Sequence, residues 1–255
     1  MKLTLIESSV GPGPRQQILA SYLVNEDVVI DAGSVGFFSP LDVQKRLRHV
    51  FISHSHIDHI ASLPIFVDNV YEPGPDCPTV HASRHTLSCL QSDIFNDRLW
   101  PDMVRLSMQE SPFLRFSEST SETTVDAGSV RVTPVLLNHL VPTSGFIIAD
   151  DDAAIAIVSD TSPTDRIWEV INQTPNLKAV FLEASFPNNM EWLAERAMHL
   201  TPSLFGAELK KLKHDVPVIA VHIKTAYDEQ VRSELQAMNL PKVEIAEPGR
   251  VYDFS

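Results

Sequence analysis

The sequence predicts an α/β fold, because short strand-forming runs and helical stretches alternate along its whole length and no region has an all-β pattern. A chain of 255 residues, of which 44% are hydrophobic, is large enough to bury a substantial core. Neither an internal repeat nor a low-complexity linker divides it. We therefore expect residues 1–255 to form a single domain.

The expected strands are short runs rich in β-forming residues. They span Val28 to Asp31, Val50 to Ser53, Val130 to Leu137, Ala153 to Val158, Ala179 to Leu182 and Val216 to Val221. Helices are expected between many of these strands. The clearest cover Ile60 to Tyr71, Thr164 to Asn172, Met190 to Met198, Pro202 to Lys213 and Asp228 to Met238. From Glu72 to Ser121, many Pro, Ser and Asp residues surround short apolar runs, which predicts a long excursion over the substrate side of the fold.

The chain carries a surplus of acidic residues, with 33 Asp and Glu against 20 Lys and Arg and a formal net charge of −13. This surplus counts against binding of long nucleic acids, because proteins that grip a phosphate backbone normally cluster Lys and Arg. The densest basic cluster, Lys210, Lys211 and Lys213, falls on an expected helix and is typical of a solvated helix face.

The first residues and the cysteines indicate a soluble, cytoplasmic protein. The opening apolar stretch is cut short by Glu7 and two serines, so we expect neither a secretory signal nor a membrane span. The two cysteines, Cys77 and Cys89, have neither CxxC spacing nor the pattern of a disulfide framework. We expect both to be buried as apolar residues.

Four potential metal ligands lie close together in the segment His-Ser-His-Ile-Asp-His, which follows the apolar run Val50-Phe51-Ile52. On a strand, His54 and His56 would share one face. A turn after the strand would swing Asp58 and His59 toward a neighbouring position, so that one short loop serves two metal ions. The alternative is a polar, His-rich surface loop, but such loops rarely leave a buried strand with this pattern.

Three further candidate ligands each follow an apolar strand. His139 follows Val135-Leu136-Leu137-Asn138, Asp160 follows Ala156-Ile157-Val158-Ser159, and His222 follows Val218-Ile219-Ala220-Val221. We expect these strands to end on the same edge of the sheet, where their last residues would meet. Each residue taken alone would be an ordinary turn or cap residue. Beside the His-rich segment, the three positions support one another as ligands.

With these residues in place, the sequence resembles the metallo-β-lactamase superfamily, whose members carry HxHxDH followed by a distant His, an Asp or Cys, and a final His. The resemblance covers most of the chain and implies an αββα four-layer sandwich. It places His54, His56 and His139 on one metal ion, Asp58, His59 and His222 on a second, and Asp160 as a bridge between both. The bridge is Asp and not Cys, which departs from the main antibiotic-degrading branch and suits the phosphodiesterase and thioesterase branches.

Two further motifs resemble those of phosphodiesterases in this superfamily, among them ribonuclease Z and the class II cyclic nucleotide phosphodiesterases. Glu183 lies in Phe181-Leu182-Glu183-Ala184-Ser185-Phe186, and His199 begins His199-Leu200-Thr201-Pro202. Breaking a phosphodiester requires a proton for the departing alkoxide, and a histidine oriented by a carboxylate is a suitable donor. The alternative is that Glu183 is an ordinary strand-end carboxylate and His199 a neighbour of a helix N-cap.

The overall resemblance is greatest to the class II cyclic nucleotide phosphodiesterases. The supporting stretches are Ser21-Tyr22-Leu23-Val24, Val29-Ile30-Asp31-Ala32-Gly33, Ser53 to Ala61, and Val221-His222-Ile223-Lys224. One departure is Ala61-Ser62-Leu63, where the family commonly has Gly, so we expect the helix entry to pack differently.

This resemblance implies hydrolysis of 3′,5′-cyclic nucleotides, cAMP first and cGMP as a second candidate, to nucleoside 5′-monophosphates by a cytoplasmic homodimer. Two divalent metal ions, expected to be Zn²⁺ although the ligands also suit Mn²⁺ and Fe, would generate the attacking hydroxide and neutralise the phosphate. Asp58 would orient the hydroxide, and His199, steadied by Glu183, would protonate the departing sugar oxygen. Lys224 would contact a phosphate or remain solvated.

The base-binding residues and the exact substrate stay open. Candidates for stacking on a purine, for most of which packing is the favoured role, are Phe37, Phe38, Phe66, Trp100, Phe186 and Trp192. A ribonuclease Z-like nuclease would use the same motifs, but the acidic charge and the lack of a Gly-rich basic arm disfavour it. A phosphodiesterase for another small diester is an alternative, whereas a thioesterase or lactonase would not require the Glu and His pair. A catalytically silent metal-binding module is disfavoured because every ligand position is filled.

Overall fold

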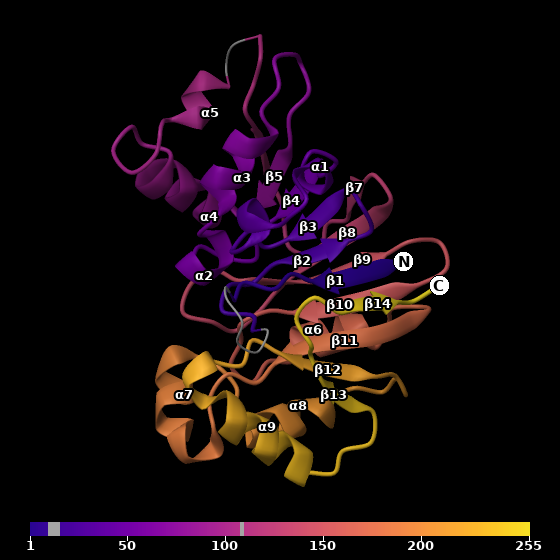
Figure 1. The fold of residues 1–255 in the computed structure, drawn as a ribbon. Coiled ribbons are helices and arrows are strands. Elements are labelled where there is room, and N and C mark those ends of the chain that lie inside the picture. Colours follow the sequence, from indigo (N-terminus) through magenta and orange to yellow (C-terminus); the bar gives the residue numbers. More distant parts are fainter. Residues whose placement is uncertain (10–15, 108–109) are drawn as a thin grey trace.

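The computed structural model describes residues 1–9, 16–107 and 110–255, which contain two seven-stranded β-sheets packed face to face (Figure 1). In the first sheet the strands follow the order β14 (Val251–Asp253), β1 (Lys2–Leu5), β2 (Tyr22–Val24), β3 (Val28–Ile30), β4 (His49–Phe51), β5 (Thr79–Ala82), β6 (Arg115–Glu118). In the second they follow the order β13 (Val243–Ile245), β12 (Val218–Val221), β11 (Leu177–Glu183), β10 (Ala154–Val158), β9 (Ser144–Ala149), β8 (Val130–Leu136), β7 (Val125–Ala127). The paired strands β1 and β14 bring the two chain ends together.

Each sheet is antiparallel in one half and parallel in the other. In the first sheet β14, β1, β2 and β3 pair antiparallel, and β3 to β6 pair parallel. The second sheet repeats this pattern, with β7 to β10 antiparallel and β10 to β13 parallel. Parallel strands present their carboxyl ends at one edge of the sheet, which is the usual place for functional loops.

Alternating side chains divide the core into three layers, because successive residues of a strand point to opposite faces. In β3, Val28 and Ile30 pack between the two sheets, whereas Val29 packs against the helices outside the first sheet. In β11, Phe181 packs between the sheets and Val180 packs under the helices outside the second sheet. Helices therefore cover both outer faces, and the expected αββα four-layer sandwich is confirmed.

The helices of each half of the chain lie with the sheet of that half (Figure 1). The first half contains α1 (Leu41–Gln44), α2 (Ile57–Ile60), α3 (Leu63–Val70), α4 (Arg84–Cys89) and α5 (Met103–Leu106). The second half contains α6 (Arg166–Ile171), α7 (Glu191–Ala197), α8 (Pro202–Leu209) and α9 (Asp228–Ala237). In the described part of the chain, none of these helices combines the length and the apolar character that a bilayer crossing requires.

The strands expected from the sequence all form, as do the expected helices, with shifted ends. The helix expected from Ile60 is interrupted: α2 ends there, and α3 begins after Ser62. The expected excursion from Glu72 to Ser121 is wrong in part, because β5 and β6 within it extend the first sheet. Leu90 and Met103 of the same segment pack into the core on the outer face of that sheet. Such strands are difficult to predict from sequence, because they are short apolar runs between turn-forming residues.

The two cysteines are free thiols in different environments. Cys77 is buried, as expected. Cys89 at the end of α4 is only half-buried, with its Sγ 3.6 Å from Nε2 of His85 one turn earlier. The expectation of burial is therefore wrong for Cys89, because Thr86 and Leu90 are the residues of this segment that face the core.

Candidate metal centre

The His-rich segment leaves the buried end of β4 and enters α2. Beyond β4, His54 is fully buried, and His56 keeps an extended backbone at the position before α2. Asp58 and His59 lie in the first turn of α2. This change from extended to helical backbone separates the ligand atoms into two groups, one with His54 and His56 and the other with Asp58 and His59.

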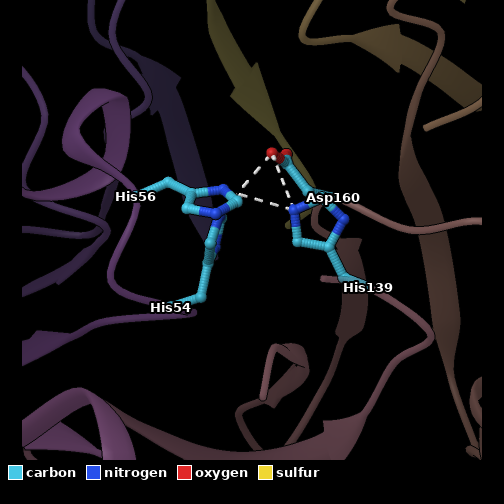
Figure 2. A group of neighbouring side chains, drawn as sticks. All are labelled: His54, His56, His139 and Asp160. Carbon is cyan, nitrogen blue, oxygen red and sulfur yellow. Dashed lines mark hydrogen bonds and ion pairs between the residues drawn. The ribbon is translucent and has the colours of Figure 1, made fainter. Parts of the chain in front are cut away.

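The first group joins the His-rich segment to the loops after β8 and β10. Figure 2 shows the side chains of His54, His56, His139 and Asp160 converging on one point, and their ligand atoms lie within 4.8 Å of one another. His139 Nε2 is 3.3 Å from His56 Nδ1, and His54 Nε2 is 3.7 Å from Asp160 Oδ2. Three imidazoles and one carboxylate are thus assembled from three separate parts of the chain.

The second group lies directly beside the first and contains Asp58, His59 and His222, whose ligand atoms also lie within 4.8 Å of one another. His222 Nε2 is 3.3 Å from His59 Nε2 and 3.4 Å from Asp58 Oδ2. Asp160 faces this group too, with Oδ2 3.4 Å from His59 Nε2 and Oδ1 3.4 Å from His222 Nε2. Asp160 therefore lies between the two groups, the position that the resemblance gives to the bridging ligand.

Buried atoms without hydrogen-bond partners show that these residues fit divalent metal ions. Within the described residues, His54 Nε2 and Asp160 Oδ1 are buried and have no hydrogen-bond partner. Leaving such atoms without hydrogen bonds normally destabilises a fold, so a buried imidazole nitrogen and a buried carboxylate oxygen of this kind fit the binding of a cation. Imidazole nitrogen and carboxylate oxygen are ligand types that suit zinc, manganese and iron.

Contacts behind the imidazoles fix which nitrogen faces the centre. His59 Nδ1 lies 2.7 Å from Asp31 Oδ2, His139 Nδ1 lies 2.9 Å from the Met198 carbonyl oxygen, and His222 Nδ1 lies 3.0 Å from Ser185 Oγ. When Nδ1–H donates to a carboxylate or carbonyl oxygen, Nε2 keeps its lone pair for a metal ion. The outer contacts therefore orient these rings with Nε2 toward the centre.

Asp31 is a positioning residue that the sequence analysis did not assign to the site. It follows β3, is 1% exposed, and accepts hydrogen bonds from Ser53 N at 2.7 Å and Ser53 Oγ at 2.9 Å as well as from His59. Its carboxylate thus holds both the start of the His-rich segment and one of its ligands. The signal available in the sequence was a carboxylate directly after a buried strand in Val-Ile-Asp-Ala-Gly.

Replacing Asp31 with asparagine is expected to weaken metal binding about 10- to 100-fold, the usual effect of losing an outer partner of a ligating histidine. The amide keeps the shape of the side chain but removes the charge that holds His59 Nδ1–H. Metal titration with a competing chelator measures the change. Asp42→Asn on the exposed surface of α1 is the matched control, and equal affinities for both variants would contradict the role of Asp31.

Gly33 allows the loop after β3 to touch the His-rich segment through its backbone. Ala20 N donates to the carbonyl oxygen of Asp58 at 2.8 Å, Gly33 N donates to Ala20 O at 2.9 Å, and Ala32 N donates to His59 O at 2.7 Å. A Cβ on Gly33 would lie 2.1 Å from the carbonyl oxygen of Asp58, which no side chain can do without moving the segment.

We expect Gly33→Ala to lower the free energy of unfolding by about 1–3 kcal/mol, as overpacking normally does, and to weaken metal binding as the segment shifts. Urea denaturation with parallel metal titration measures both effects. Gly206→Ala in α8 is the control, because its added methyl would meet only the movable end of Met238. Gly33→Ala behaving like Gly206→Ala would show that the close approach is unimportant.

Glu183 and His199 form a buried pair beside Asp160. Glu183 is the last residue of β11 and is fully buried. Its Oε1 lies 2.8 Å from His199 Nδ1 and also accepts a hydrogen bond from Thr161 N at 2.8 Å. Its Oε2 accepts Ser185 Oγ at 2.7 Å and Leu200 N at 3.1 Å. The other ring nitrogen, His199 Nε2, lies 3.9 Å from Asp160 Oδ2.

The charges of this pair stabilise each other. Burial opposes the charged form of His199, but the charge of Glu183 and its hydrogen bond outweigh burial and raise the pKa of His199 above its ordinary value. Burial likewise opposes the charged form of Glu183, yet the charge and hydrogen bond of His199 hold the pKa of Glu183 below its usual range. Each charge therefore favours the other, and a protonated His199 held by an ionised Glu183 is the state that can donate a proton.

Burial and neighbouring carboxylates shift the pKa values of the other candidate ligands in different directions. Burial lowers the pKa of His54, His56 and His139, so these imidazoles are neutral near pH 7. Burial opposes the charged form of His59, but Asp160 and Asp31 raise the pKa of His59 well above its ordinary value. A metal ion at the second group would therefore compete with a proton for His59.

The structure also places the aromatic residues that were considered as base contacts. Phe66 is fully buried in the core outside the first sheet, which excludes it from stacking on a base. Phe186 is nearly buried, with its ring centroid 5.7 Å from that of His199. Phe37 and Trp192 are well exposed, and Trp192 carries the Arg196 guanidinium over its ring at 5.7 Å.

Comparisons with known proteins bear on this site and on the fold. A family model described as class-II cAMP phosphodiesterases matches residues 39–239. A probable 3′,5′-cyclic-nucleotide phosphodiesterase of Yersinia pestis is 28% identical over 286 residues, which covers 87% of this chain and 80% of the relative. Two solved structures share the fold, with 98% of each chain covered and 18% identity. They are unliganded yeast PDE1, with a TM-score of 0.79, and the metallo-β-lactamase fold protein YhfI of Bacillus subtilis, with a TM-score of 0.71. These likenesses confirm the metallo-β-lactamase fold expected from the sequence.

Proposed function

Because this chain belongs to the class-II cAMP phosphodiesterase family of metal-dependent hydrolases, we propose that it hydrolyses 3′,5′-cyclic nucleotides to nucleoside 5′-monophosphates at a site that binds two divalent metal ions. The observation that carries the proposal is the position of Asp160. Its carboxylate faces both groups of candidate ligands and, 3.9 Å away, the ring of His199, which is paired with a buried glutamate. Metal ligands and a proton donor thus meet at one point.

The two ions are assigned to the residues that the structure brings together. We assign His54, His56 and His139 to one ion, Asp58, His59 and His222 to the other, and Asp160 to both. Ions bound there would lower the pKa of a water molecule and neutralise the phosphoryl oxygens. Zinc is our choice, with manganese and iron as the alternatives that this ligand set also accepts.

The protein's own groups would position and transfer the protons. Burial opposes the charged form of Asp58, but the adjacent imidazoles of His222 and His59 and the ammonium group of Lys224 hold the pKa of Asp58 well below its usual range. Asp58 therefore stays ionised and accepts a hydrogen bond from the attacking water. As the water oxygen loses a proton to solvent and bonds to phosphorus, the bond from phosphorus to O3′ would break and His199 Nε2–H would give its proton to O3′. Glu183 keeps the ring in place and stabilises its charge.

A third group of candidate ligands includes His199 and gives it a different possible role. The ligand atoms of Asp160, His199 and His222 also lie within 4.8 Å of one another, so His199 is placed to ligate a metal ion itself. The bond from its Nδ1 to Glu183 and its raised pKa favour the proton donor. Metal content of a His199 variant separates the two roles.

Hydrolysis of cAMP in ¹⁸O-labelled water, followed by ³¹P NMR and chromatography, tests the proposed reaction. We expect 5′-AMP with one labelled oxygen on phosphorus. Formation of 3′-AMP would overturn the assignment of O3′ as the leaving group. Cleavage of a precursor tRNA without cAMP hydrolysis would favour a ribonuclease Z-like nuclease, which the net charge of −13 disfavours. Bound metal without hydrolysis of any diester would favour a silent metal-binding module.

The proposal also covers the preferred substrate, the domain organisation and location, and the oligomeric state. We propose that cAMP is the first substrate with cGMP as a second, that the chain is a single domain acting in the cytoplasm, and that it forms a homodimer. Light scattering with detection of monomer and dimer masses tests the dimer. Comparison of kcat/KM for the two nucleotides measures the preference between adenine and guanine.

A further inference from the structure

Lys224 makes the most direct cationic contact to the centre. Its Nζ lies 3.1 Å from Asp58 Oδ2, the oxygen that is also 3.4 Å from His222 Nε2. Among the ion pairs of the described residues, no other Lys or Arg pairs with a candidate metal ligand. Sequence patterns left a phosphate contact and a solvated lysine equally open for this residue, and the structure shows the ammonium group at the centre.

The backbone holds Lys224 in this position. His222 follows β12 in the left-handed region with φ 58°, which turns the chain sharply after the strand. Lys224 N then donates to Ser185 O at 3.2 Å, and Lys224 O accepts Tyr227 N at 2.8 Å in the 3₁₀ turn Thr225–Tyr227. The backbone of Lys224 is therefore fixed beside a candidate ligand, and its side chain starts from a defined position next to the centre.

The ammonium group keeps donors available. It has three N–H donors, and one of them faces Asp58. The side chain of Lys224 is 34% exposed and that of Asp58 is 23% exposed, whereas His54, His59 and Asp160 are almost fully buried. Lys224 thus lies on the solvent side of the candidate ligands, where a substrate would arrive.

We propose that Lys224 is a specificity-determining residue that binds a non-bridging oxygen of the phosphoryl group and makes the centre prefer anionic diesters to neutral esters. The inference rests on the proposed function for the identity of the diester as a cyclic nucleotide. Asp31 and Glu183 are each paired with a histidine, and Asp58 and Asp160 are candidate metal ligands, so Lys224 adds a cation on the entry side that these carboxylates do not fully neutralise. A fixed ammonium group on the entry side attracts the anion and pairs with an oxygen that a neutral ester lacks.

Holding Asp58 in place is the competing role for Lys224, and variants separate the two. Lys224→Met keeps the apolar stem and removes the charge, whereas Lys224→Arg keeps the charge. Lys210→Met, at an exposed position after α8, is the control for loss of a lysine. The zinc-loaded proteins would be compared on bis(p-nitrophenyl) phosphate and on the neutral ester p-nitrophenyl acetate. Calorimetry with inorganic phosphate gives a readout that needs no turnover, and bound zinc per chain is measured for each variant.

We expect Lys224→Met to lower kcat/KM for the anionic diester roughly ten- to a hundredfold, the range of a lost hydrogen bond to a charged group. Phosphate binding should weaken in parallel, with unchanged zinc content and a much smaller effect on the neutral ester. Lys224→Arg should keep most of the diester activity and phosphate affinity that Lys224→Met loses. Equal losses on both esters together with lost zinc would overturn the proposal in favour of holding Asp58, and unchanged phosphate affinity would also overturn it. Hydrolysis of the artificial diester without cAMP hydrolysis would refute the proposed function and leave the test of Lys224 intact.

Discussion

Asp160→Asn is expected to abolish stable binding of the metal pair, with a loss of affinity greater than the roughly 10- to 100-fold that an outer hydrogen-bond partner contributes. The carboxylate oxygens of Asp160 lie 3.4–4.0 Å from imidazole nitrogens on five histidines. Asparagine keeps the shape but replaces one oxygen ligand by an NH₂ group and removes the negative charge. Hydrolysis should disappear with the metal, as measured by bound metal per chain and by turnover on the same samples.

Glu208→Gln provides the matched control for Asp160→Asn. Glu208 is a buried carboxylate in the same half of the chain, and it accepts Trp168 Nε1 at 2.7 Å and pairs with Lys211 at 2.8 Å. Its loss should lower the stability of the fold and leave metal content unchanged. A normal metal content in Asp160→Asn would show that Asp160 is not a ligand, whatever its effect on turnover.

His199→Ala should lower kcat for cAMP by about a hundredfold or more, because positioned general acids typically contribute 10²–10⁴-fold. Metal content should stay nearly unchanged if His199 donates a proton, and it should fall if His199 is a ligand in the third group of side chains. Pre-steady-state kinetics measure the rate of cAMP hydrolysis, and metal analysis of the same samples measures the metal content. Turnover equal to that of the unaltered protein would remove His199 from the reaction.

Glu183→Gln tests the same pair through its pH dependence. The charge of Glu183 raises the pKa of His199 above its ordinary value of 6.5, so the protonated, proton-donating form persists to higher pH. Removing that charge should move the alkaline decline of kcat to lower pH. For the metal-free protein, a raised folded-state pKa contributes stability that is fully present below 6.5 and is lost as the pH rises through the folded-state pKa. The variant should lose this part of the pH dependence of unfolding; an unchanged profile would contradict the pairing.

The strand ends and the spacing of ligand types were the features of the site most open to prediction. His139, Asp160 and His222 each follow an apolar run, and parallel or adjacent strands bring such positions to one edge of a sheet. The segment from His54 to His59 contributes the other four candidate ligands. Its backbone changes from extended to helical, which separates the four side chains into two groups. Periodicity and residue type are local properties, and here they coincide with the geometry of the site.

The contacts behind the ligands depend on tertiary packing and could not be read from spacing. Asp31 meets His59 only because β3 and β4 pair in parallel, and Ser185 meets His222 because β11 pairs with β12. The interruption of the expected helix after Ile60 has a similar origin. Ser62 Oγ donates a hydrogen bond to Ala32 O at 2.9 Å and accepts one from Gly36 N at 2.9 Å, so this serine connects two loops to the start of α3.

Turnover of cAMP, cGMP and bis(p-nitrophenyl) phosphate by zinc-loaded protein, measured beside metal-free protein and beside His56→Ala and Asp160→Ala variants, tests most directly whether this chain is a cyclic nucleotide phosphodiesterase. We expect cAMP hydrolysis to 5′-AMP that requires metal and is lost in both variants. Hydrolysis of the artificial diester alone would contradict the cyclic nucleotide substrate and keep the metal site. Zinc-loaded protein that hydrolyses no diester would contradict the proposed reaction itself.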